Sequence, residues 1–325
     1  MFRPDHRGRI RSGGVAMNAL TVLSPGLLTT VQDLGREGYG PIGVSASGAA
    51  DALSLRVGNK LVGNPEGAAG FEMTLLGGAF QFAQDATIAV AGSDFGAKTD
   101  DRSLPVYAAI SVDAGQSIKF GPTKSGARAY LCIRGGIAVP EFFGSRSTHL
   151  LSGLGGFEGR ALRKGDVLPV GDPAKLPPPQ QFNERWRPLL AARKTLRVTR
   201  GPQWDNFSEA ARINFVEQTY LVTEEANRMG IRLKGSQFEL ASTGEMITEG
   251  VLLGAIQVTP GGQPIILFVE QQTTGGYPKI ANVIARDLGS VGQLRPRDEI
   301  RFELVTMDAA RELYREQERL LAPLK

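Results

Sequence analysis

The sequence has little cysteine or histidine: one cysteine, Cys132, and two histidines, His6 and His149, in 325 residues. A single cysteine excludes an internal disulfide, and so few of both residues exclude a metal centre built from histidine and cysteine. A serine-histidine-aspartate triad would have to use His149, and the sequence has no Gly-x-Ser-x-Gly motif. A transient Mg²⁺ held by carboxylates stays open, because that ion keeps much of its ligation from water and phosphate.

Long hydrophobic runs are also missing. No window approaches the roughly 18 consecutive apolar residues that indicate a membrane-spanning helix. The first residues lack the apolar core of a signal peptide. We therefore expect a cytoplasmic protein that does not enter a membrane.

Positive charge is scarce outside the N-terminus. Four arginines and one aspartate give residues 1–16 a charge of +3, out of a net charge of +4 for the chain. The remainder is nearly neutral, so its charge gives no support for binding nucleic acid. We interpret residues 1–16 as a disordered leader and place the start of the first domain at Met17.

Two glycine-containing stretches carry only part of a nucleotide-binding motif. Gly38–Gly43 has the Gly-x-Gly-x-x-Gly spacing, but a polar segment precedes it and Pro41 lies inside it. In Gly121–Ser125, Lys124 follows Thr123 and not a glycine, and no helical pattern comes after it. We therefore predict neither a dinucleotide-binding fold nor a Walker A loop.

Glycine and proline, in contrast, are abundant, with 41 and 19 residues. Between residues 71 and 139, short runs of β-branched and aromatic residues alternate with turn residues, as is typical of antiparallel barrels and sandwiches. The proline-rich stretch 173–194 is the clearest break in composition. We predict an N-terminal β-barrel domain over 17–172, a linker over 173–194 and a C-terminal β-barrel domain over 195–325.

Two helices stand out from this pattern of short strands. Leu53, Val57 and Leu61 recur at four-residue spacing, and Ser47 is predicted to cap the helix that carries them. The stretch 308–321 is amphipathic and is expected to pack on the C-terminal domain.

The stretch with the most ligand-suited chemistry is Gln272–Ile280, which follows a predicted buried strand over Pro264–Val269. The paired glycines Gly275 and Gly276 allow a close approach of the backbone to a ligand. Two hydroxyls, a phenol and an ammonium group surround them, from Thr273, Thr274, Tyr277 and Lys279. The same residue types suit an ordinary turn, so both interpretations stay open.

Two other segments place cations beside glycines. In Gly144–Thr148, Arg146 stands next to two hydroxyl residues, and in Asn227–Leu233, Arg228 precedes a glycine. Such segments suit a carboxylate or a phosphate, and the alternative is that they are solvated loops. We expect Arg146, Arg228 and Lys279 to meet in one pocket that holds a small anion.

Six segments together resemble the family of the 5-oxoprolinase C subunit, also called KipA-like or allophanate hydrolase subunit 2, which is related to the carboxyltransferase portion of urea carboxylase. In the family's order they are Thr29–Arg36, Ser47–Asp51, Gly144–Thr148, Asn227–Leu233, Glu249–Val258 and Thr273–Ile280. The resemblance runs from about Leu20 to Leu304. It implies a mainly β chain with two cyclophilin-like β-barrel domains and a few short helices.

The resemblance also implies an enzyme component that is inactive without its partners. The C subunit would act with the KipI-like B subunit to phosphorylate the lactam oxygen of 5-oxoproline, with ATP and Mg²⁺ shared between the two. The LamB/YcsF-like A subunit would then help to open the ring to glutamate. A lactam is a poor electrophile, and a phosphate ester on its oxygen gives the carbon a better leaving group.

Residue type and motif position give the candidate site within this resemblance. The catalytic candidates are Asp33 and Glu270, as metal or acid-base groups, and Lys279. The substrate-binding candidates are Arg146, Ser147, Thr148, Arg228, Gln257, Gln272, Thr273, Thr274, Gly275, Gly276 and Tyr277. The family usually has Asp where this chain has Glu270, and the longer side chain moves a carboxylate oxygen by roughly 1 Å, enough to alter substrate positioning.

Two other functions fit the same resemblance. Biotin-dependent carboxyl transfer to urea or another amide would need partners for the biotin and for ATP, because this chain has no Met-Lys biotin acceptor. A non-catalytic regulatory protein would use the same loops to bind the KipI-like partner. The amidase signature of a true allophanate hydrolase is absent, and prolyl isomerase activity does not follow from a cyclophilin-like fold alone.

Overall fold

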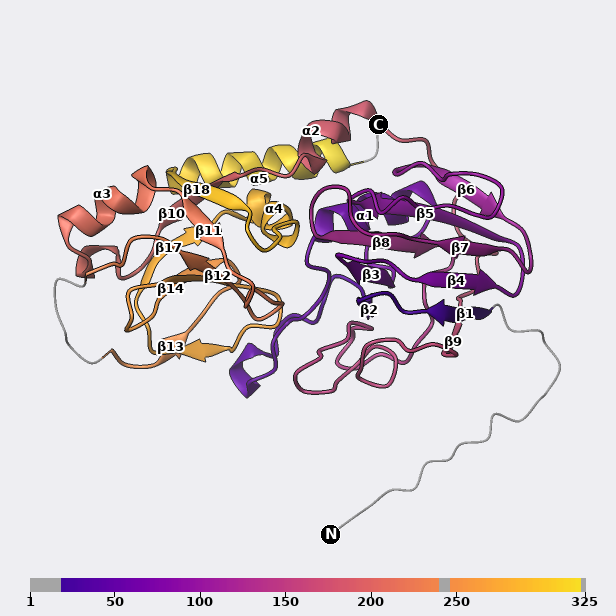
Figure 1. Cartoon of the computed structure of the whole chain (residues 1–325), viewed down its shortest axis with the longest axis horizontal. Helices are drawn as coiled ribbons and strands as arrows, with labels where there is room; N and C mark the ends of the chain where they lie inside the picture. The colour runs from indigo at the N-terminus through magenta and orange to yellow at the C-terminus, as the bar shows by residue number, and fades with distance from the viewer. Residues whose placement is uncertain (1–18, 240–245, 323–325) are drawn as a thin grey trace, which may run out of the picture.

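The computed structural model describes residues 19–239 and 246–322 and shows two units side by side, with the C-terminal helix lying along both (Figure 1). The leader predicted over residues 1–16 lies outside the described residues. Within these ranges, no helix has the length and apolar character needed to cross a membrane.

The first unit is built from two antiparallel sheets that face each other. One sheet has the strand order β7-β4-β1-β9 and the other the order β2-β3-β8-β5-β6. The Phe71 ring of one sheet and the Phe80 ring of the other have centroids 5.1 Å apart, inside a single core. The strands are β1 (Ala19–Ser24), β2 (Leu28–Gln32), β3 (Gly70–Thr74), β4 (Ala79–Phe82), β5 (Ala86–Gly92), β6 (Ala109–Val112), β7 (Ser117–Lys119), β8 (Arg128–Ile133) and β9 (Val167–Pro169).

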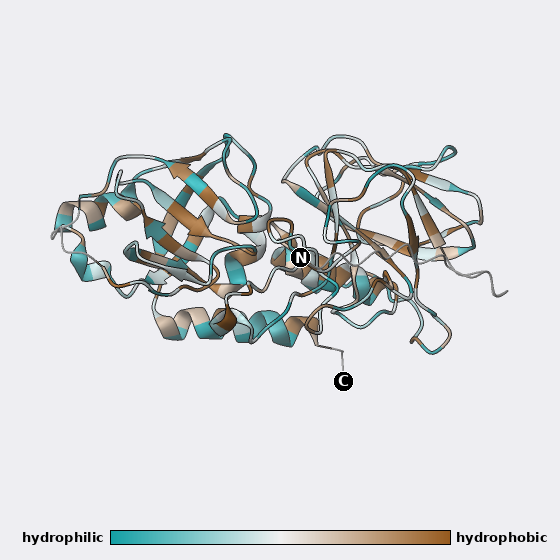
Figure 2. Cartoon of the chain, turned by 90° about the horizontal axis from the view of Figure 1, so that it is seen from below, coloured by the Kyte–Doolittle hydropathy of each residue, from teal (hydrophilic) through white to brown (hydrophobic). Residues whose placement is uncertain are grey.

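The second unit is a closed barrel with the strand order β10-β17-β14-β15-β12-β11-β18. Parallel pairing of β10 with β18 closes it, so these strands leave no unpaired edge. Figure 2 shows hydrophobic residues on the strands of both units. The strands are β10 (Thr195–Arg200), β11 (Tyr220–Val222), β12 (Gly230–Lys234), β14 (Ala255–Val258), β15 (Pro264–Leu267), β17 (Lys279–Val283) and β18 (Glu299–Leu304).

Short elements complete the chain, and the prediction of a mainly β protein with a few short helices is confirmed. A small separate sheet pairs β13 (Glu249–Gly250) with β16 (Thr274–Gly275). The α-helices are α1 (Ala52–Leu61), α2 (Arg187–Leu190), α3 (Glu209–Glu217), α4 (Leu288–Gly292) and α5 (Met307–Leu321). The 3₁₀ helices are η1 (Gly40–Ile42), η2 (Glu184–Trp186), η3 (Trp204–Asn206) and η4 (Ala285–Asp287).

The prediction that Ser47 caps the first long helix is wrong. Asp51 is the N-cap of α1, and its carboxylate accepts a hydrogen bond from the Ser54 amide. Ser47 instead has a φ of +55° and donates its hydroxyl to the Thr148 carbonyl at 2.7 Å. The backbone before α1 forms a loop in which Gly48 has a φ of +95° and the Ala50 amide donates to the Glu72 carboxylate at 2.8 Å.

The helix α5 packs across both units and not on the C-terminal unit alone. Leu321 belongs to the core cluster that surrounds α1, and the Trp186 indole in the proline-rich segment donates to the Leu320 carbonyl at 3.0 Å. Arg56 of α1 binds both carboxylate oxygens of Glu318, each at 2.7 Å. The end of the chain is therefore fixed to the first unit.

Replacing Arg56 by glutamine is expected to weaken this junction at neutral pH but not in acid. The hydrogen bonds from Arg56 lower the pKa of Glu318 below its ordinary value of 4.5. Because the folded-state pKa lies below the unfolded one, the stabilisation is complete above the unfolded-state pKa and is lost as the pH falls through the folded-state pKa. We expect Arg56→Gln to lower the free energy of unfolding by about 1 kcal/mol near neutral pH, measured by urea denaturation.

The matched control for Arg56 is Arg319→Gln. Arg319 pairs with Glu312 where both side chains are more than half exposed, so its loss is expected to change stability little at either pH. A loss for Arg56→Gln that stays the same from neutral pH down through the acid titration of the carboxylates would contradict the assignment.

Candidate functional site

Buried polar side chains gather where the two units meet. Segments 32–51 and 145–149 of the first unit lie against Arg228 and segment 268–273 of the second. Ionisable groups are rarely buried unless they are paired, so this concentration marks the junction as the candidate site. The buried polar residues here are Gln32, Asp33, Arg36, Ser45, Ser47, Asp51, Glu72, Arg128, Ser145, Ser147, Thr148, His149, Arg228, Glu270 and Gln293.

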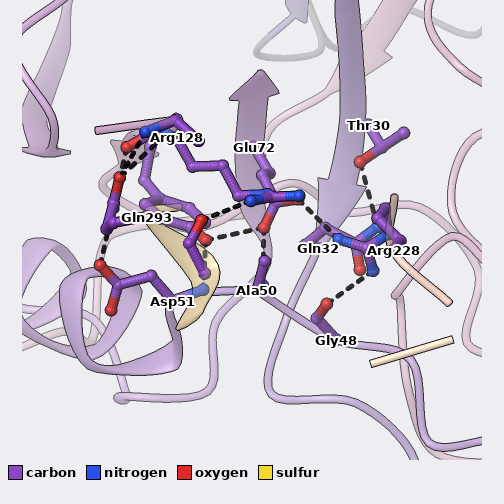
Figure 3. A network of polar contacts seen from close by, with 12 residues as sticks. Thr30, Gln32, Gly48, Ala50, Asp51, Glu72, Arg128, Arg228 and Gln293 are labelled. Carbon is purple, nitrogen blue, oxygen red and sulfur yellow. Dashed lines mark hydrogen bonds and ion pairs between the residues drawn. The ribbon is translucent and has the colours of Figure 1, made fainter. Parts of the chain in front are cut away.

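Arg228 connects the two units through its guanidinium group (Figure 3). It donates to Glu72 at 2.6 Å and to the Gly48 carbonyl at 2.7 Å in the first unit, and to Glu270 at 2.5 Å in the second. Burial alone lowers the pKa of Arg228, but the Glu72 and Glu270 carboxylates raise it overall. The guanidinium therefore stays charged although its side chain is only 5% exposed.

Glu72 extends this network into the core of the first unit. Its second oxygen accepts hydrogen bonds from the Ala50 amide at 2.8 Å and from the Tyr130 hydroxyl at 2.7 Å. Burial, and then the Glu72 and Asp51 carboxylates, raise the pKa of Tyr130 well above its usual value of 10.0. The phenol therefore stays protonated and can donate to Glu72.

Gln293 uses both ends of its amide to bind the first unit. Its nitrogen donates to Asp51 at 2.8 Å and to the Arg128 carbonyl at 3.1 Å. Its oxygen accepts from the amides of Ala127 and Arg128, each at 3.0 Å. A side chain at the preceding Gly292 would collide with the Ala50 carbonyl. These contacts set how the two units meet.

Asp33, a predicted catalytic residue, ties two loops of the first unit together. One carboxylate oxygen accepts from the hydroxyls of Ser145 and Ser147, at 2.7 and 2.5 Å, and from the Gly35 amide at 2.8 Å. The other accepts from the Arg146 amide at 2.5 Å. Both oxygens are therefore engaged, and the acid-base or metal role of Asp33 stays a prediction.

Glu270, the second predicted catalytic carboxylate, has one oxygen available. Arg228 binds Oε1, and among the described residues no hydrogen bond reaches Oε2. His149 lies close enough for their charges to interact. Burial, together with Arg36 and Arg228, lowers the pKa of His149 below 6.5 although Glu270 raises it, so the imidazole is neutral at neutral pH.

The glycine-rich stretch with the most ligand-suited residue types lies on the barrel side, in β16 and the turn after it. The Gln257 amide donates to the Tyr277 carbonyl at 3.3 Å, and the Gln272 amide donates to Gln257 at 3.4 Å. A Cβ at Gly275 would lie 2.5 Å from the Gln257 side-chain nitrogen, so a larger residue there would displace the Gln257 amide. Thr274 and Tyr277 are exposed, and Thr273 and Gly276 are half-buried.

The three cations that were expected to meet in one pocket lie in separate ion pairs. Arg146 pairs with Glu141 at 2.9 Å on the surface of the first unit, and Arg228 is held in the buried network. Lys279 is buried and pairs with Glu249, whose carboxylate also accepts from Gln203 at 2.8 Å. In the part of the chain that the structure describes, no hydrogen bond or ion pair joins the three.

The residues predicted beside Arg146 are buried and bonded. Ser147 binds Asp33, and the Thr148 hydroxyl donates to the Val31 carbonyl at 3.0 Å.

No group of three or more histidine, cysteine, aspartate or glutamate residues is arranged for a metal ion among residues 19–239 and 246–322.

Several residues of the junction were not singled out as candidates from the sequence, among them Arg36, Ser45, Glu72 and His149. Arg36 stands in Thr29–Arg36, one of the segments that resemble the family, and this position was the signal by which it could have been found. Glu72 lies inside strand β3. The pattern of apolar residues along a strand does not show that a carboxylate is buried, because its partners come from distant segments. His149 follows Thr148 directly and was set aside because its sequence neighbours offered no partner.

Known proteins share this arrangement of two units. A family model described as the carboxyltransferase domain, subdomains A and B, matches residues 42–304. The chain belongs to this carboxyltransferase-domain family. A 5-oxoprolinase C subunit from Haemophilus influenzae is 38% identical over 289 residues, which cover 89% of this chain and 92% of the relative. The Escherichia coli protein of the same name is 35% identical over 94% of this chain and 97% of its own.

A solved structure supports the assignment of this chain to the carboxyltransferase-domain family. The crystal structure of the K. lactis urea amidolyase matches it with a TM-score of 0.90 at 35% identity, over 95% of this chain and 20% of that chain. The resemblance to the 5-oxoprolinase C subunit, and to urea-carboxylating proteins, is thus confirmed. The chain spans about a fifth of the urea amidolyase, so the activity of that whole protein does not transfer to it directly.

Replacing Arg228 by methionine is expected to lower the free energy of unfolding of the carboxyltransferase-domain chain by about 3–5 kcal/mol. The substitution leaves Glu72 and Glu270 buried without their shared cation, which is the reason for the large effect. Urea denaturation followed by circular dichroism measures the loss.

Two variants control for the loss of a cation as such. Arg146→Met removes a partly exposed pair and is expected to cost at most about 1 kcal/mol. Adding Glu72→Gln and Glu270→Gln to Arg228→Met should recover part of the stability, because the two carboxylates that lost Arg228 are removed, although Arg128 then loses its pairing with Glu72. If Arg228→Met costs no more than Arg146→Met, the buried network does not hold the units together.

Proposed function

We propose that this chain is the C subunit of an ATP-dependent 5-oxoprolinase complex, which opens a cyclic amide and is cytoplasmic. The observation that carries the proposal is the similarity to two proteins that bear the name of the 5-oxoprolinase C subunit, at 38% and 35% identity over 92% and 97% of their lengths. The proposed partners are the B subunit, which is KipI-like, and the A subunit, which is LamB/YcsF-like. The chain alone has no turnover.

The reaction starts with transfer of the γ-phosphoryl group of ATP to the lactam oxygen of 5-oxoproline, with ADP as the leaving group. The phosphate ester makes the ring carbon electrophilic, and water then opens the ring to glutamate with release of phosphate. Mg²⁺ neutralises charge on the phosphates when it is bound. The junction carboxylates are largely engaged by protein donors, so Mg²⁺ would take its ligands mainly from ATP, water and the KipI-like partner.

The available oxygen of Glu270 makes this residue the better placed of the two proposed acid-base groups. Arg228 fixes its carboxylate, and the neutral imidazole of His149 lies near it. Lys279 supplies a cation next to the loop that holds Gly275 and Gly276, where the backbone can approach a phosphate oxygen. The hydroxyl and amide candidates of both loops position the substrate.

A second candidate function is carboxyl transfer to a urea-like amide from biotin carried by a partner. The carboxyltransferase family model and the TM-score of 0.90 with urea amidolyase favour it. A third is a regulatory role in which the chain binds the KipI-like partner without catalysing a step. All three place a partner polypeptide on this chain, so the reaction must be measured in the complex.

Lys279→Ala is expected to reduce 5-oxoproline-dependent ATP hydrolysis by about a hundredfold in the complex co-expressed from the chain and its two proposed partners. The reason is the loss of the cation next to the glycine loop. Size-exclusion chromatography must show that the complex still assembles. Lys119→Ala is the matched control, since Lys119 pairs with Asp100 on an exposed surface.

The outcomes separate the three functions. Loss of turnover in an assembled Lys279→Ala complex supports a catalytic site in this chain. Unchanged turnover assigns catalysis to the partners and leaves the regulatory function. Biotin-dependent and bicarbonate-dependent ATP hydrolysis, with urea but not with 5-oxoproline, would favour carboxyl transfer.

A further inference from the structure

Four side chains of the junction have a buried polar atom without a hydrogen-bond partner among the described residues, those of Gln32, Arg36, Ser45 and Arg128, and two of them, Arg36 and Ser45, line one pocket. Arg36 is 2% exposed and Ser45 is 7% exposed. Among the described residues, the Nη1 of Arg36 and the hydroxyl of Ser45 make no hydrogen bond. Burying such donors without partners is costly, so each indicates a ligand or a bound water.

The rest of the Arg36 guanidinium is fixed in place. Its Nη2 donates to the Ser147 carbonyl, and its Nε donates to the Phe142 carbonyl at 3.3 Å. The guanidinium also lies 5.8 Å from the centre of the Phe142 ring. Burial lowers the pKa of Arg36, while Asp33 and Glu270 raise it, and an arginine remains charged throughout. A charged donor is thus held with one nitrogen unoccupied.

Arg36 and Ser45 line the same pocket, which has a volume of about 270 Å³. The loop over residues 36–47 forms one side, and segments 251–253 and 268–273 of the barrel form the other. The barrel side is mainly apolar, with Leu253 and Phe268 among its residues. The exposed Glu37 also lines the pocket and provides an acceptor beside these donors.

We propose that this pocket binds a small cyclic carboxylate, with the carboxylate on Arg36 and Ser45 and the ring against Leu253 and Phe268. The proposal rests on the proposed function, because it names the pocket in which the substrate of that reaction sits. One guanidinium nitrogen and one hydroxyl supply two donors for two carboxylate oxygens. The Glu37 carboxylate provides an acceptor for a ring N–H.

The pocket size agrees with a small ligand. A volume of about 270 Å³ lies just below the usual range for drug-sized ligands, as a five-membered ring with one carboxylate requires. The mixed lining suits that molecule better than it suits urea, which has no carboxylate and little apolar surface. The carboxylate is therefore the group by which the site distinguishes its ligand from a neutral amide.

The test is a binding measurement on the full-length chain and on its complex with the proposed partners. L-5-Oxoproline and 2-pyrrolidinone are the probes, since they share the lactam ring and only the first has a carboxylate. Isothermal titration calorimetry is expected to give at least about tenfold tighter binding of 5-oxoproline. Equal affinities, or no binding of 5-oxoproline to either the chain or the complex, would overturn the proposal.

Ser45→Ala provides the sharpest variant, because the hydroxyl has no partner whose loss would unfold the protein. Its affinity for 5-oxoproline should fall by about tenfold, and its affinity for 2-pyrrolidinone should not change. Its melting temperature should stay the same or rise. Arg36→Gln should lose more affinity, and if it fails to fold, Ser45→Ala decides alone. The exposed Ser103→Ala and Arg163→Gln are the matched controls and should bind as the unaltered chain does.

Failure of this proposal can be told from failure of the proposed function. The complex could bind the carboxylate ligand selectively, and lose affinity in Ser45→Ala, without hydrolysing 5-oxoproline. That result supports the pocket and rejects the proposed function. Turnover of 5-oxoproline with a KM that neither Ser45→Ala nor a folded Arg36→Gln raises overturns the pocket and retains the function.

Discussion

The arrangement of the two units depends on one buried guanidinium, that of Arg228. A charge in that position is tolerated only because Glu72 and Glu270 lie within 2.6 Å of it, one from each unit, and the Gly48 carbonyl takes a further donor. Separating the units would take Glu72 away from Arg228, which would keep only Glu270 of its two carboxylate partners. Hydrogen bonds and ion pairs, and not apolar contact alone, therefore set the geometry of the junction.

The same network connects stability to the proposed chemistry. Arg228 orients the Glu270 carboxylate, while Glu72 holds the Ala50 amide and so places the loop before α1. Asp33 ties the loop that carries Arg36 to the loop that carries Ser147 and His149. Groups that would be mobile on separate loops are thereby held at fixed distances, which is a requirement for selective binding of a small molecule.

Not every buried polar group is used in this framework. Arg36 and Ser45 each keep a donor that the described residues do not satisfy, beside a pocket with an apolar wall. Proteins retain unsatisfied buried groups mainly at sites where a ligand or a solvent molecule completes them. The contrast with Gln293, whose amide is bonded at both ends between the units, separates residues that hold the fold from residues available to a ligand.

The sequence alone determined the β-rich architecture and the family, because strand patterns and turn residues are local and the motif order is linear. It could not determine which polar residues are buried. Arg146 and Arg228 stand in similar glycine-containing segments, yet one lies on the surface and the other is 156 residues away from Glu72 in sequence and bonded to it. Only tertiary structure brings such groups together, and for the same reason the cap of α1 and the position of α5 could not be predicted from the sequence.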